Sequence, residues 1–346
     1  MVKNIFGILK VLFVIVGTII GAGFVSGKEI YLFFNTYGKF GVLGFFFTSL
    51  MFSIVIYRVF LLAKKMNCSS YSKFSEEVNQ KNIRFIKRII LYFLLISFYI
   101  MVAGMSAYFK QQYKIPEILT ATIMSFTCYQ ILKRNIEGII TLNNLLIPFI
   151  IVFIMVLGVK NTDYILNCKF EINKTNSSCV KFLLSSVLYA SYNSLILIPI
   201  IVELSKKIGS KKNIVIVTIM CFFIMFVLGV NIIYIIQSGG NYLRSTELPM
   251  VEIVKRFGII SQRLYGVVII IAIITSAIAS AHSFLEEIRD KKGKFKKELL
   301  LICVVAPVIS QIGFSKLVKV LYPIFGILGL WQIYNIFSYK RDNKNY

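Results

Sequence analysis

Residues 15–30 read IVGTIIGAGFVSGKEI. Four glycines and a serine interrupt this apolar stretch before it ends on Lys28 and Glu29. In the interior of a helix, each glycine costs about 1 kcal/mol relative to alanine. Inside a bilayer, backbone groups released from a helix must be satisfied by protein, water or ligand. The stretch is therefore apolar enough to enter a membrane, yet it is poorly suited to an unbroken helix.

The rest of the sequence indicates a membrane protein. Of 346 residues, 57% are apolar and only 16% are charged, whereas a soluble domain carries about 25% charged residues. The charges are separated by uncharged runs, and all of these except 118–132 reach the roughly 17 residues that a spanning helix needs. The runs are 11–27, 40–57, 89–109, 118–132, 138–159, 182–202, 213–243, 264–285, 299–315 and 320–338. We therefore expect an all-α membrane protein with about ten transmembrane helices.

The net charge of +24 indicates membrane orientation and not nucleic-acid binding. If the N-terminus lies inside, most of the lysines and arginines fall in the inner segments, as the positive-inside rule requires. These segments are 1–10, 58–88, 133–137, 203–212, 286–298 and 339–346. Both termini are then cytoplasmic, and the basic residues contact anionic lipid head groups. No basic stripe with aromatic platforms is visible, so we expect no nucleic-acid partner.

The six cysteines do not form a recognisable disulfide framework. Only Cys168 and Cys179 share a compartment, the outer loop between spans five and six. A disulfide and a pair of free thiols both remain open there. The first apolar run has no small-residue cleavage pattern, so we expect it to be retained as a helix.

The span count predicts an inverted repeat. Ten spans divide into two halves of five, about 5–159 and 180–339, and an odd number per half turns the second half upside down in the membrane. Spans one and six then occupy corresponding positions, as in transporters whose paired interrupted helices hold the substrate. Both have polar centres, GTIIGAGFVSG in span one and SSVLYASYNS in span six. We therefore expect both spans to be interrupted around a binding site at mid-membrane.

The outer loop 238–263 contains a candidate short helix. Pro249 suits a first helical turn, and the apolar residues that follow at helical spacing are Met250, Ile253, Val254 and Phe257. Such a helix either lies at the membrane interface or closes the outer vestibule. The sequence leaves both interpretations open.

Two interpretations of residues 15–30 compete. Gly17, Gly21 and Ala22 form a small-xxx-small pattern that suits a close helix crossing. Packing alone, however, does not require Gly23 or Gly27 in addition, so the stretch favours a broken helix.

A break in span one would have two electrostatically different ends. The first half-helix would finish near Ile20 with unpaired carbonyl groups, which suit a cation. The second would begin near Val25 with free amide groups, which suit a carboxylate. One break could thus hold a coupling ion and the carboxylate of an amino acid side by side.

The motif GTIIGAGFVSGKEI closely resembles the opening motif of the YkvI-like family of bacterial membrane proteins, in the amino acid–polyamine–organocation superfamily. In that family the motif runs close to GTxIGAGFASGQE. Length and span count also match, so the resemblance covers essentially the whole chain. It implies a LeuT-like fold in the bacterial cell membrane and says little about the substrate. Two departures are Val25 for Ala and Lys28 for Gln, and the latter places a cation beside the expected site.

Span eight carries hydroxyl groups in the sequence AIITSAIASAHSF, residues 272–284. Thr275 and Ser276 could simply bond to their own helix. However, TSAIA is similar to the span-eight signature of sodium-coupled members of the leucine-transporter fold. The resemblance implies a sodium site, in keeping with the preference of hard cations for oxygen ligands. Its ligands would be the carbonyls of Gly17 and Ile20 and the hydroxyls of Thr275 and Ser276. Proton-coupled relatives can place a lysine in span five, and none lies within the membrane here, which favours sodium.

The substrate site is expected where span one faces span six. Tyr189 and Asn193 share one helical face, although span-six polar groups could instead link helices. The candidate substrate-binding residues are Gly21, Ala22, Gly23, Phe24, Val25, Ser26, Tyr189, Ser191 and Asn193. Ser97 or Tyr99 of span three is a further candidate.

Three ionisable residues lie near the predicted site. Lys28 and Glu29 are chain neighbours, which do not face each other on a helix. Glu29 is therefore expected to pair across to another helix, or to relay a proton if coupling is protonic. His282 is the only histidine, so it has no histidine partner for a metal site, and a proton gate is its alternative role.

The sequence thus predicts a secondary active transporter that carries an amino acid or similar small zwitterion in symport with sodium, by alternating access. Sodium is the coupling ion, and no other cofactor is expected; the partners are the substrate and the lipid bilayer. Proton coupling is one alternative. Another is an amino-acid sensor, since germinant-receptor subunits share this superfamily's fold. An enzyme is not expected and no catalytic residue is assigned, because Asp163 and Asp290 lie in loops.

Overall fold

The computed structural model describes residues 2–68, 70–78, 83–133, 137–162, 179–240, 243, 246–288 and 295–339, and every regular element within these ranges is helical. The elements of the first half are α1 (Val2–Ile19), α2 (Ala22–Val25), α3 (Lys28–Phe33), η1 (Asn35–Tyr37), α4 (Lys39–Lys65), α5 (Tyr71–Val78), α6 (Ile83–Tyr113), α7 (Glu117–Lys133) and α8 (Glu137–Lys160). Those of the second half are α10 (Cys179–Leu204), α11 (Lys211–Gln237), α12 (Pro249–Val254), η4 (Lys255–Phe257), α13 (Ile259–Ile288), α14 (Phe295–Ser310) and α15 (Phe314–Ser338).

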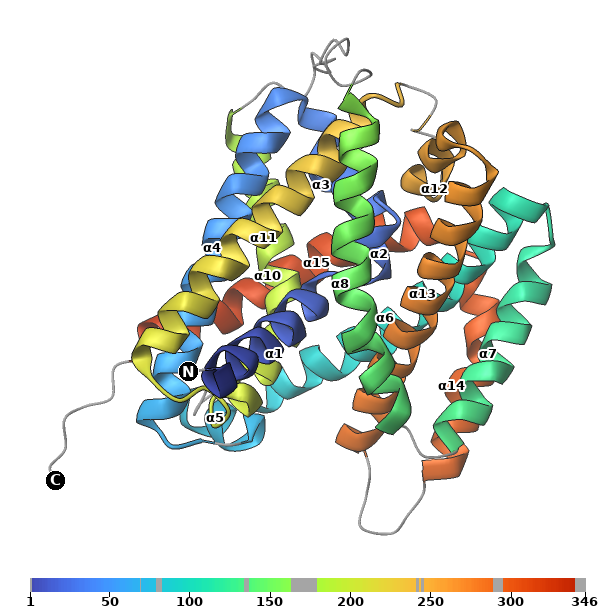
Figure 1. Ribbon diagram of the computed structural model, residues 1–346. Helices are drawn as coiled ribbons and strands as arrows, with labels where there is room; N and C mark the ends of the chain where they lie inside the picture. The colour runs from blue at the N-terminus through green and yellow to red at the C-terminus, as the bar shows by residue number, and fades with distance from the viewer. Residues whose placement is uncertain are drawn as a thin grey trace, which may run out of the picture.

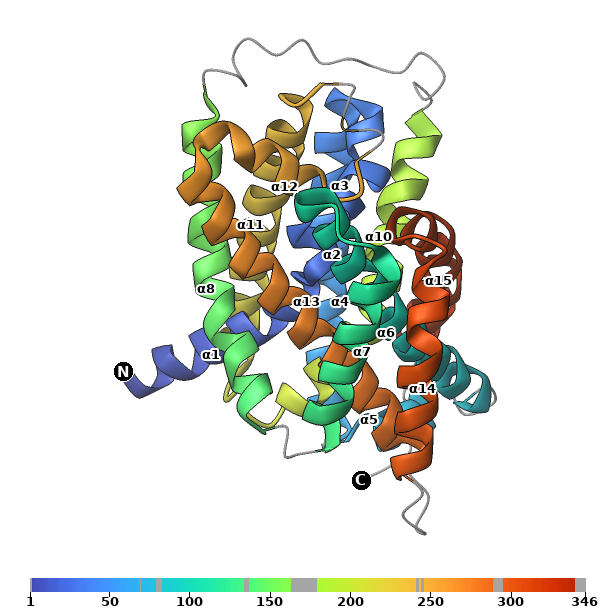
Figure 2. The same ribbon diagram turned by 90° about the vertical axis from the view of Figure 1, so that its right-hand side faces the viewer.

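The long helices form one bundle, shown from two sides in Figures 1 and 2. Each uncharged run of the sequence lies mainly on one helix of this bundle, although 11–27 also covers α2, and 213–243 and 299–315 extend past the ends of α11 and α14. In the described part of the chain, six helices are long and apolar enough to cross a membrane, namely α4, α6, α10, α11, α13 and α15. Shorter apolar stretches lie in α1 and α8. The chain is therefore a multi-pass membrane protein, while the full count of ten spans stays a prediction.

Large apolar side chains cover the outside of the bundle as well as its core. Val159 and Ile260 are each 73% exposed, and Val308 of α14 is 70% exposed. A soluble protein rarely exposes extended apolar patches of this kind. The lipid bilayer is the medium that suits such a surface.

Span one is interrupted, as the glycines predicted, and its first half ends close to the expected Ile20, whereas its second half begins earlier than expected. α1 ends at Ile19, and Gly21 is extended with φ −79° and ψ 179°. The second half begins at Ala22 and not near Val25, because the Val25 amide already bonds to the Gly21 carbonyl at 3.1 Å and closes a helical turn. A second bend separates α2 from α3 at Gly27, whose φ of 76° is a conformation that glycine adopts without strain.

The prediction that span six is also interrupted is wrong. α10 runs without a break from Cys179 to Leu204. Ser186, Ser191 and Ser194 bond back to carbonyls of their own helix, whereas Ser185 donates to the Phe33 carbonyl of α3. Ser191 donates to the Val187 carbonyl at 2.6 Å, and Ser194 donates to the Ala190 carbonyl at 2.7 Å. A polar stretch can thus cross the bundle without a break when its hydroxyl groups have acceptors one turn back.

The short helix predicted in the outer loop is α12, and it lies inside the bundle. Met250, Ile253 and Val254 are buried, and α12 contacts α3, α11 and α13. The Met250 amide donates to the Ser26 carbonyl at 3.1 Å. Of the two open interpretations, the structure thus favours a plug over an interfacial helix, and α12 holds the second bend of span one.

Candidate functional site

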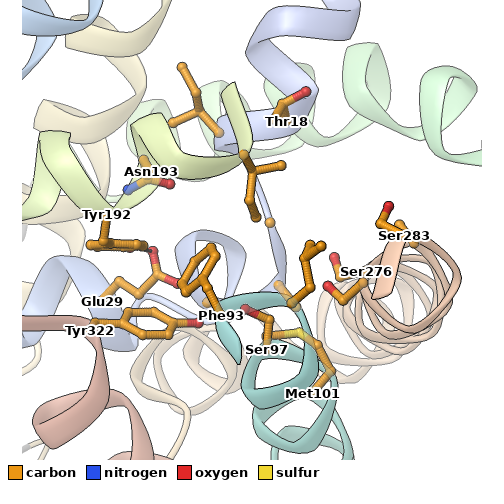
Figure 3. A pocket seen from close by; sticks show the side chains of 18 of the residues that line it. Thr18, Glu29, Phe93, Ser97, Met101, Tyr192, Asn193, Ser276, Ser283 and Tyr322 are labelled. Carbon is orange, nitrogen blue, oxygen red and sulfur yellow. Dashed lines mark hydrogen bonds between the residues drawn. The ribbon is translucent and has the colours of Figure 1, made fainter. Parts of the chain in front are cut away.

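A cavity of about 190 Å³ lies at the α1–α2 break, in the middle of the bundle. For scale, an engineered apolar cavity of about 150 Å³ holds a benzene molecule. Figure 3 shows its side chains converging from several helices. The lining residues that matter below are Gly17, Gly21, Ala22 and Gly23 of span one, Glu29 of α3, Ser97 and Met101 of α6, Tyr192 and Asn193 of α10, Ser276, Ser280 and Ser283 of α13, and Tyr322 of α15.

The cavity opens toward one end of the bundle. Ala279 and Ser283 are exposed where they line it on α13, beyond Ser276 in the direction of the end of that helix. Glu29 and the tyrosines around it lie at the opposite end and are buried. In Figure 2 the first part of α1 extends away from the side of the bundle near the open end. With the orientation predicted from the basic residues, this open end faces the cytoplasm.

Glu29 is bonded to tyrosines from another part of the chain. Its side chain is 5% exposed. The Tyr192 hydroxyl donates to Glu29 Oε2 at 2.6 Å, and the Tyr189 hydroxyl donates to the same oxygen at 3.2 Å. Tyr322 of α15 stacks near Tyr192 with 4.5 Å between ring centroids, and its hydroxyl also faces the carboxyl group (Figure 3). We refer to Glu29, Tyr189, Tyr192 and Tyr322 as the tyrosine cluster. Glu29 thus pairs across to another helix, as expected.

Gly23 leaves the space in which the Glu29 carboxyl group lies. A Cβ atom at this position would overlap Glu29 Oε1 and would come within 2.9 Å of Glu29 Cγ. One carboxyl oxygen therefore lies against the start of α2, and the other accepts the tyrosine bonds. This close approach explains why the motif needs a glycine beyond those that break the helix.

Lys28 is turned away from the cavity. Its side chain is buried, and Nζ donates to the Thr246 carbonyl at 2.6 Å, in the segment before α12. It lines instead a second hollow of about 650 Å³ between α3, α10 and α15, together with Leu188 and Lys319. The ammonium group of Lys28 therefore lies outside the cavity and not within it.

The predicted substrate residues divide into two groups. Gly21, Ala22, Gly23 and Asn193 line the cavity. The others do not: Phe24 packs against Phe45, the Val25 carbonyl accepts a bond from Tyr265, Ser26 donates to the Gly23 carbonyl, Ser191 bonds to its own helix, and Tyr189 acts through Glu29.

The predicted sodium ligands also divide. Gly17 and Ser276 both line the cavity, from α1 and α13. Ile20 is buried away from it, and the Thr275 hydroxyl bonds to the Ile271 carbonyl of its own helix at 2.9 Å. His282 does not line the cavity, and its Nδ1 atom is buried without a hydrogen-bond partner.

Some predictions fall on parts that the structure does not describe. The Cys168–Cys179 pair is one of these, since the loop before α10 and the side chain of Cys179 lie outside the described residues. Asp163 and Asp290 also lie outside them. The alternatives for the two cysteines therefore remain as the sequence left them.

The sequence reasoning missed several lining residues. Ser280 and Ser283 follow Ser276 after four and seven residues, so they share its helical face. That spacing is visible in the span-eight sequence and could have found them. No sequence pattern of this kind points to Tyr322 or Met101, because each is an isolated residue in an ordinary apolar run.

Comparisons with known proteins identify relatives that span nearly the whole chain. No family model matches the sequence. The membrane protein YkvI of Bacillus subtilis (strain 168) is 26% identical over 336 residues, which cover 92% of each chain. The protein YyaD of the same strain is 22% identical over 342 residues and 96% of each chain.

Two solved structures are similar to the whole bundle. A mutant of the manganese transporter of Eremococcus coleocola has a TM-score of 0.60 at 13% identity, over 94% of this chain and 77% of that one. The inward-facing conformation of Mhp1 has a TM-score of 0.51 at 12% identity, over 92% and 72%. At these identities the likeness shows the fold alone, and this is the LeuT-like transporter fold that the sequence predicted. Membership of the wider superfamily stays a prediction.

Proposed function

We propose that the chain is a secondary active transporter that carries a small amino acid or a similar zwitterion, coupled to sodium, by alternating access. The observation that carries this proposal is the cavity at the α1–α2 break, which opens to one end of the bundle and is closed at the other by buried side chains. A cargo that reaches such a cavity can leave on the other side only after the bundle rearranges. The transporter fold supports the same conclusion.

The polar groups at the cavity suit a molecule that carries both a positive and a negative charge. The Glu29 carboxyl group can accept hydrogen bonds from an ammonium group. The amides of Ala22 and Gly23 begin α2 beside it and suit a carboxylate. These groups, and the small volume of the cavity, support a small amino acid as the cargo.

Sodium coupling rests on the two walls of the cavity near the break. The end of α1 contributes Gly17, and α13 contributes Ser276. Carbonyl and hydroxyl oxygens are ligands that hard cations prefer. An ion bound between these helices would stabilise one arrangement of the bundle over the other, which is what coupling requires.

Proton coupling is the second candidate, and Glu29 favours it. A buried carboxyl group that lines a transport cavity is a common proton carrier in membrane proteins. The topology proposed for either mechanism places both termini in the cytoplasm of a bacterial cell. The halves 5–159 and 180–339 would then move relative to each other as inverted repeats.

Uptake into proteoliposomes tests the proposal. Labelled amino acids are offered under an inward sodium gradient, an equal potassium gradient and an acid-outside pH gradient. We expect uptake with sodium only, and a large loss in Ser276→Ala. Uptake driven only by external acid would replace sodium with protons. No uptake of any amino acid under all three conditions would contradict the proposed cargo.

A further inference from the structure

Glu29 is a buried acid without a basic partner. The ion pairs of the described residues are Lys87–Glu76, Lys110–Glu117 and Lys255–Glu252, and none of them involves Glu29. Burying a carboxylate without a counter-charge is strongly unfavourable, and such groups are normally neutralised by a proton or by a bound cation. The charge of Glu29 must therefore be neutralised in one way when the cavity is empty and in another way when it holds a cargo.

The charged and titratable groups around Glu29 leave this charge uncompensated. α3 packs against α10, α11, α12 and α15. α10 and α15 contribute the three tyrosine hydroxyls of the tyrosine cluster. The carboxylate of α12, Glu252, is bonded to Lys255 and Gln111. On α11, Ile236 lies against Gly27 at the start of α3, and Lys28 donates to Thr246.

The tyrosine cluster can hold Glu29 in either protonation state. A tyrosine hydroxyl is both a donor and an acceptor, so it can donate to a carboxylate or accept from a carboxylic acid. A lysine or arginine in the same place would hold the group permanently ionised. The tyrosines bond to Oε2, while Oε1 faces Gly23 at the break, where the cavity admits a cargo.

We propose that Glu29 is an exchange site: its carboxyl group holds a proton when the cavity is empty and the cationic nitrogen of the cargo when the cavity is loaded. Binding of the cargo then releases one proton, and the cationic nitrogen of the cargo replaces that proton as the partner of the Glu29 carboxylate. The inference rests on the proposed function and narrows its cargo to molecules with a protonated amine.

The direction of coupling follows from this exchange. Because the proton leaves as the cargo arrives, the carrier that returns empty takes its proton from the side where the cargo was released. A gradient that is acid inside therefore drives uptake. A proton symporter would respond to the opposite gradient, acid outside.

The first test needs no knowledge of the cargo. The full chain in lipid nanodiscs is treated with dicyclohexylcarbodiimide, an apolar reagent that adds to protonated carboxyl groups, and Glu29 labelling is measured by peptide mass spectrometry between pH 5.5 and 8.5. We expect labelling that falls about tenfold per pH unit at the alkaline end. Glu252, which is ion-paired, is the internal control, and Glu29→Gln should show no label at position 29. Labelling that is absent or independent of pH overturns the proposal.

The second test uses defined probes. Thermal stabilisation is measured with the twenty L-amino acids, and with ethylamine and propionate as the cationic and anionic fragments of alanine. We expect ethylamine but not propionate to stabilise the protein, with affinity about tenfold weaker for each pH unit below the range in which Glu29 is ionised. Glu29→Gln should abolish this pH dependence, with Gly104→Ala as the matched folded control. Propionate binding without ethylamine binding, or an affinity that does not depend on pH, overturns the proposal.

These tests separate the two proposals. If ethylamine binds with proton competition but no amino acid is transported, transport fails and the exchange site stands. If amino acids are transported by sodium and Glu29 labelling does not depend on pH, transport stands and the exchange site fails.

Discussion

Replacing Gly23 by alanine tests whether the cavity depends on the position of the Glu29 carboxyl group. The new Cβ would lie 2.9 Å from Glu29 Cγ and would overlap the carboxyl oxygen beside it. Carbon atoms pack at about 3.5 Å or more, so Cγ must retreat by roughly 0.6 Å and the carboxyl group by more. The bond from Tyr189 is already 3.2 Å long, so we expect the displaced carboxyl group to lose the geometry in which it accepts bonds from both tyrosine hydroxyls.

The expected loss follows from the bonds that break. A hydrogen bond to a charged group contributes about 1.5–3 kcal/mol, so losing one of the two tyrosine bonds costs about 1.5–3 kcal/mol. At 1.4 kcal/mol per factor of ten, this predicts a loss of cargo affinity of about tenfold to a hundredfold. The assay is the concentration of labelled amino acid at half-maximal uptake in proteoliposomes.

The matched control is Gly104→Ala in α6. A Cβ at Gly104 would lie 3.4 Å from the ring of Phe314, which is ordinary packing contact, and alanine is the better helix former by about 1 kcal/mol. This variant should transport like the original protein. Gly23→Ala must also elute as a folded protein from a sizing column. If it is folded and its half-maximal concentration changes less than threefold, the position of Glu29 does not matter and the reasoning is refuted.

Three further predictions concern single side chains of the same region. Tyr192→Phe removes the 2.6 Å bond to Glu29 and should weaken cargo binding by about tenfold; unchanged uptake kinetics would contradict a role for the cluster. Ser276→Ala should raise the sodium concentration for half-maximal uptake by about tenfold or more, whereas Thr275→Ala should have a smaller effect because that hydroxyl bonds to its own helix; equal effects would count against the geometry. Lys28→Met removes the bond to Thr246 and should loosen the packing around the second hollow, which Leu188 lines as well. A cysteine placed at Leu188 should therefore react faster with an impermeant maleimide added from outside. The same rate in both proteins would show that Lys28 does not help to close this side of the bundle.

The class of the molecule follows from the sequence because lipid imposes a simple physical requirement. Long uncharged runs of about 20 residues have no suitable medium other than a bilayer, and this needs no tertiary information. The break in span one was equally visible. Gly17, Gly21 and Gly23 weaken a helix by their own backbone properties, which are local.

The sequence could not decide whether span six is broken, because the polar side chains of a helix can form their hydrogen bonds in two ways. Ser191 and Ser194 can line a broken helix or bond one turn back, and the same letters suit both. Which of these occurs depends on the groups of α15 and α3 that pack against α10. The sequence prediction of a break there failed for this reason.

The chemistry of the cavity depended on tertiary structure above all. The sequence placed Glu29 near Lys28 but could not say that Lys28 turns toward Thr246 while Glu29 turns toward tyrosines more than 150 residues away. Three tyrosine hydroxyls, one carboxyl group and the missing side chain of Gly23 meet only when α3, α10 and α15 pack together. Local backbone preference therefore decided where span one breaks, whereas long-range packing decided which charge lies in the cavity.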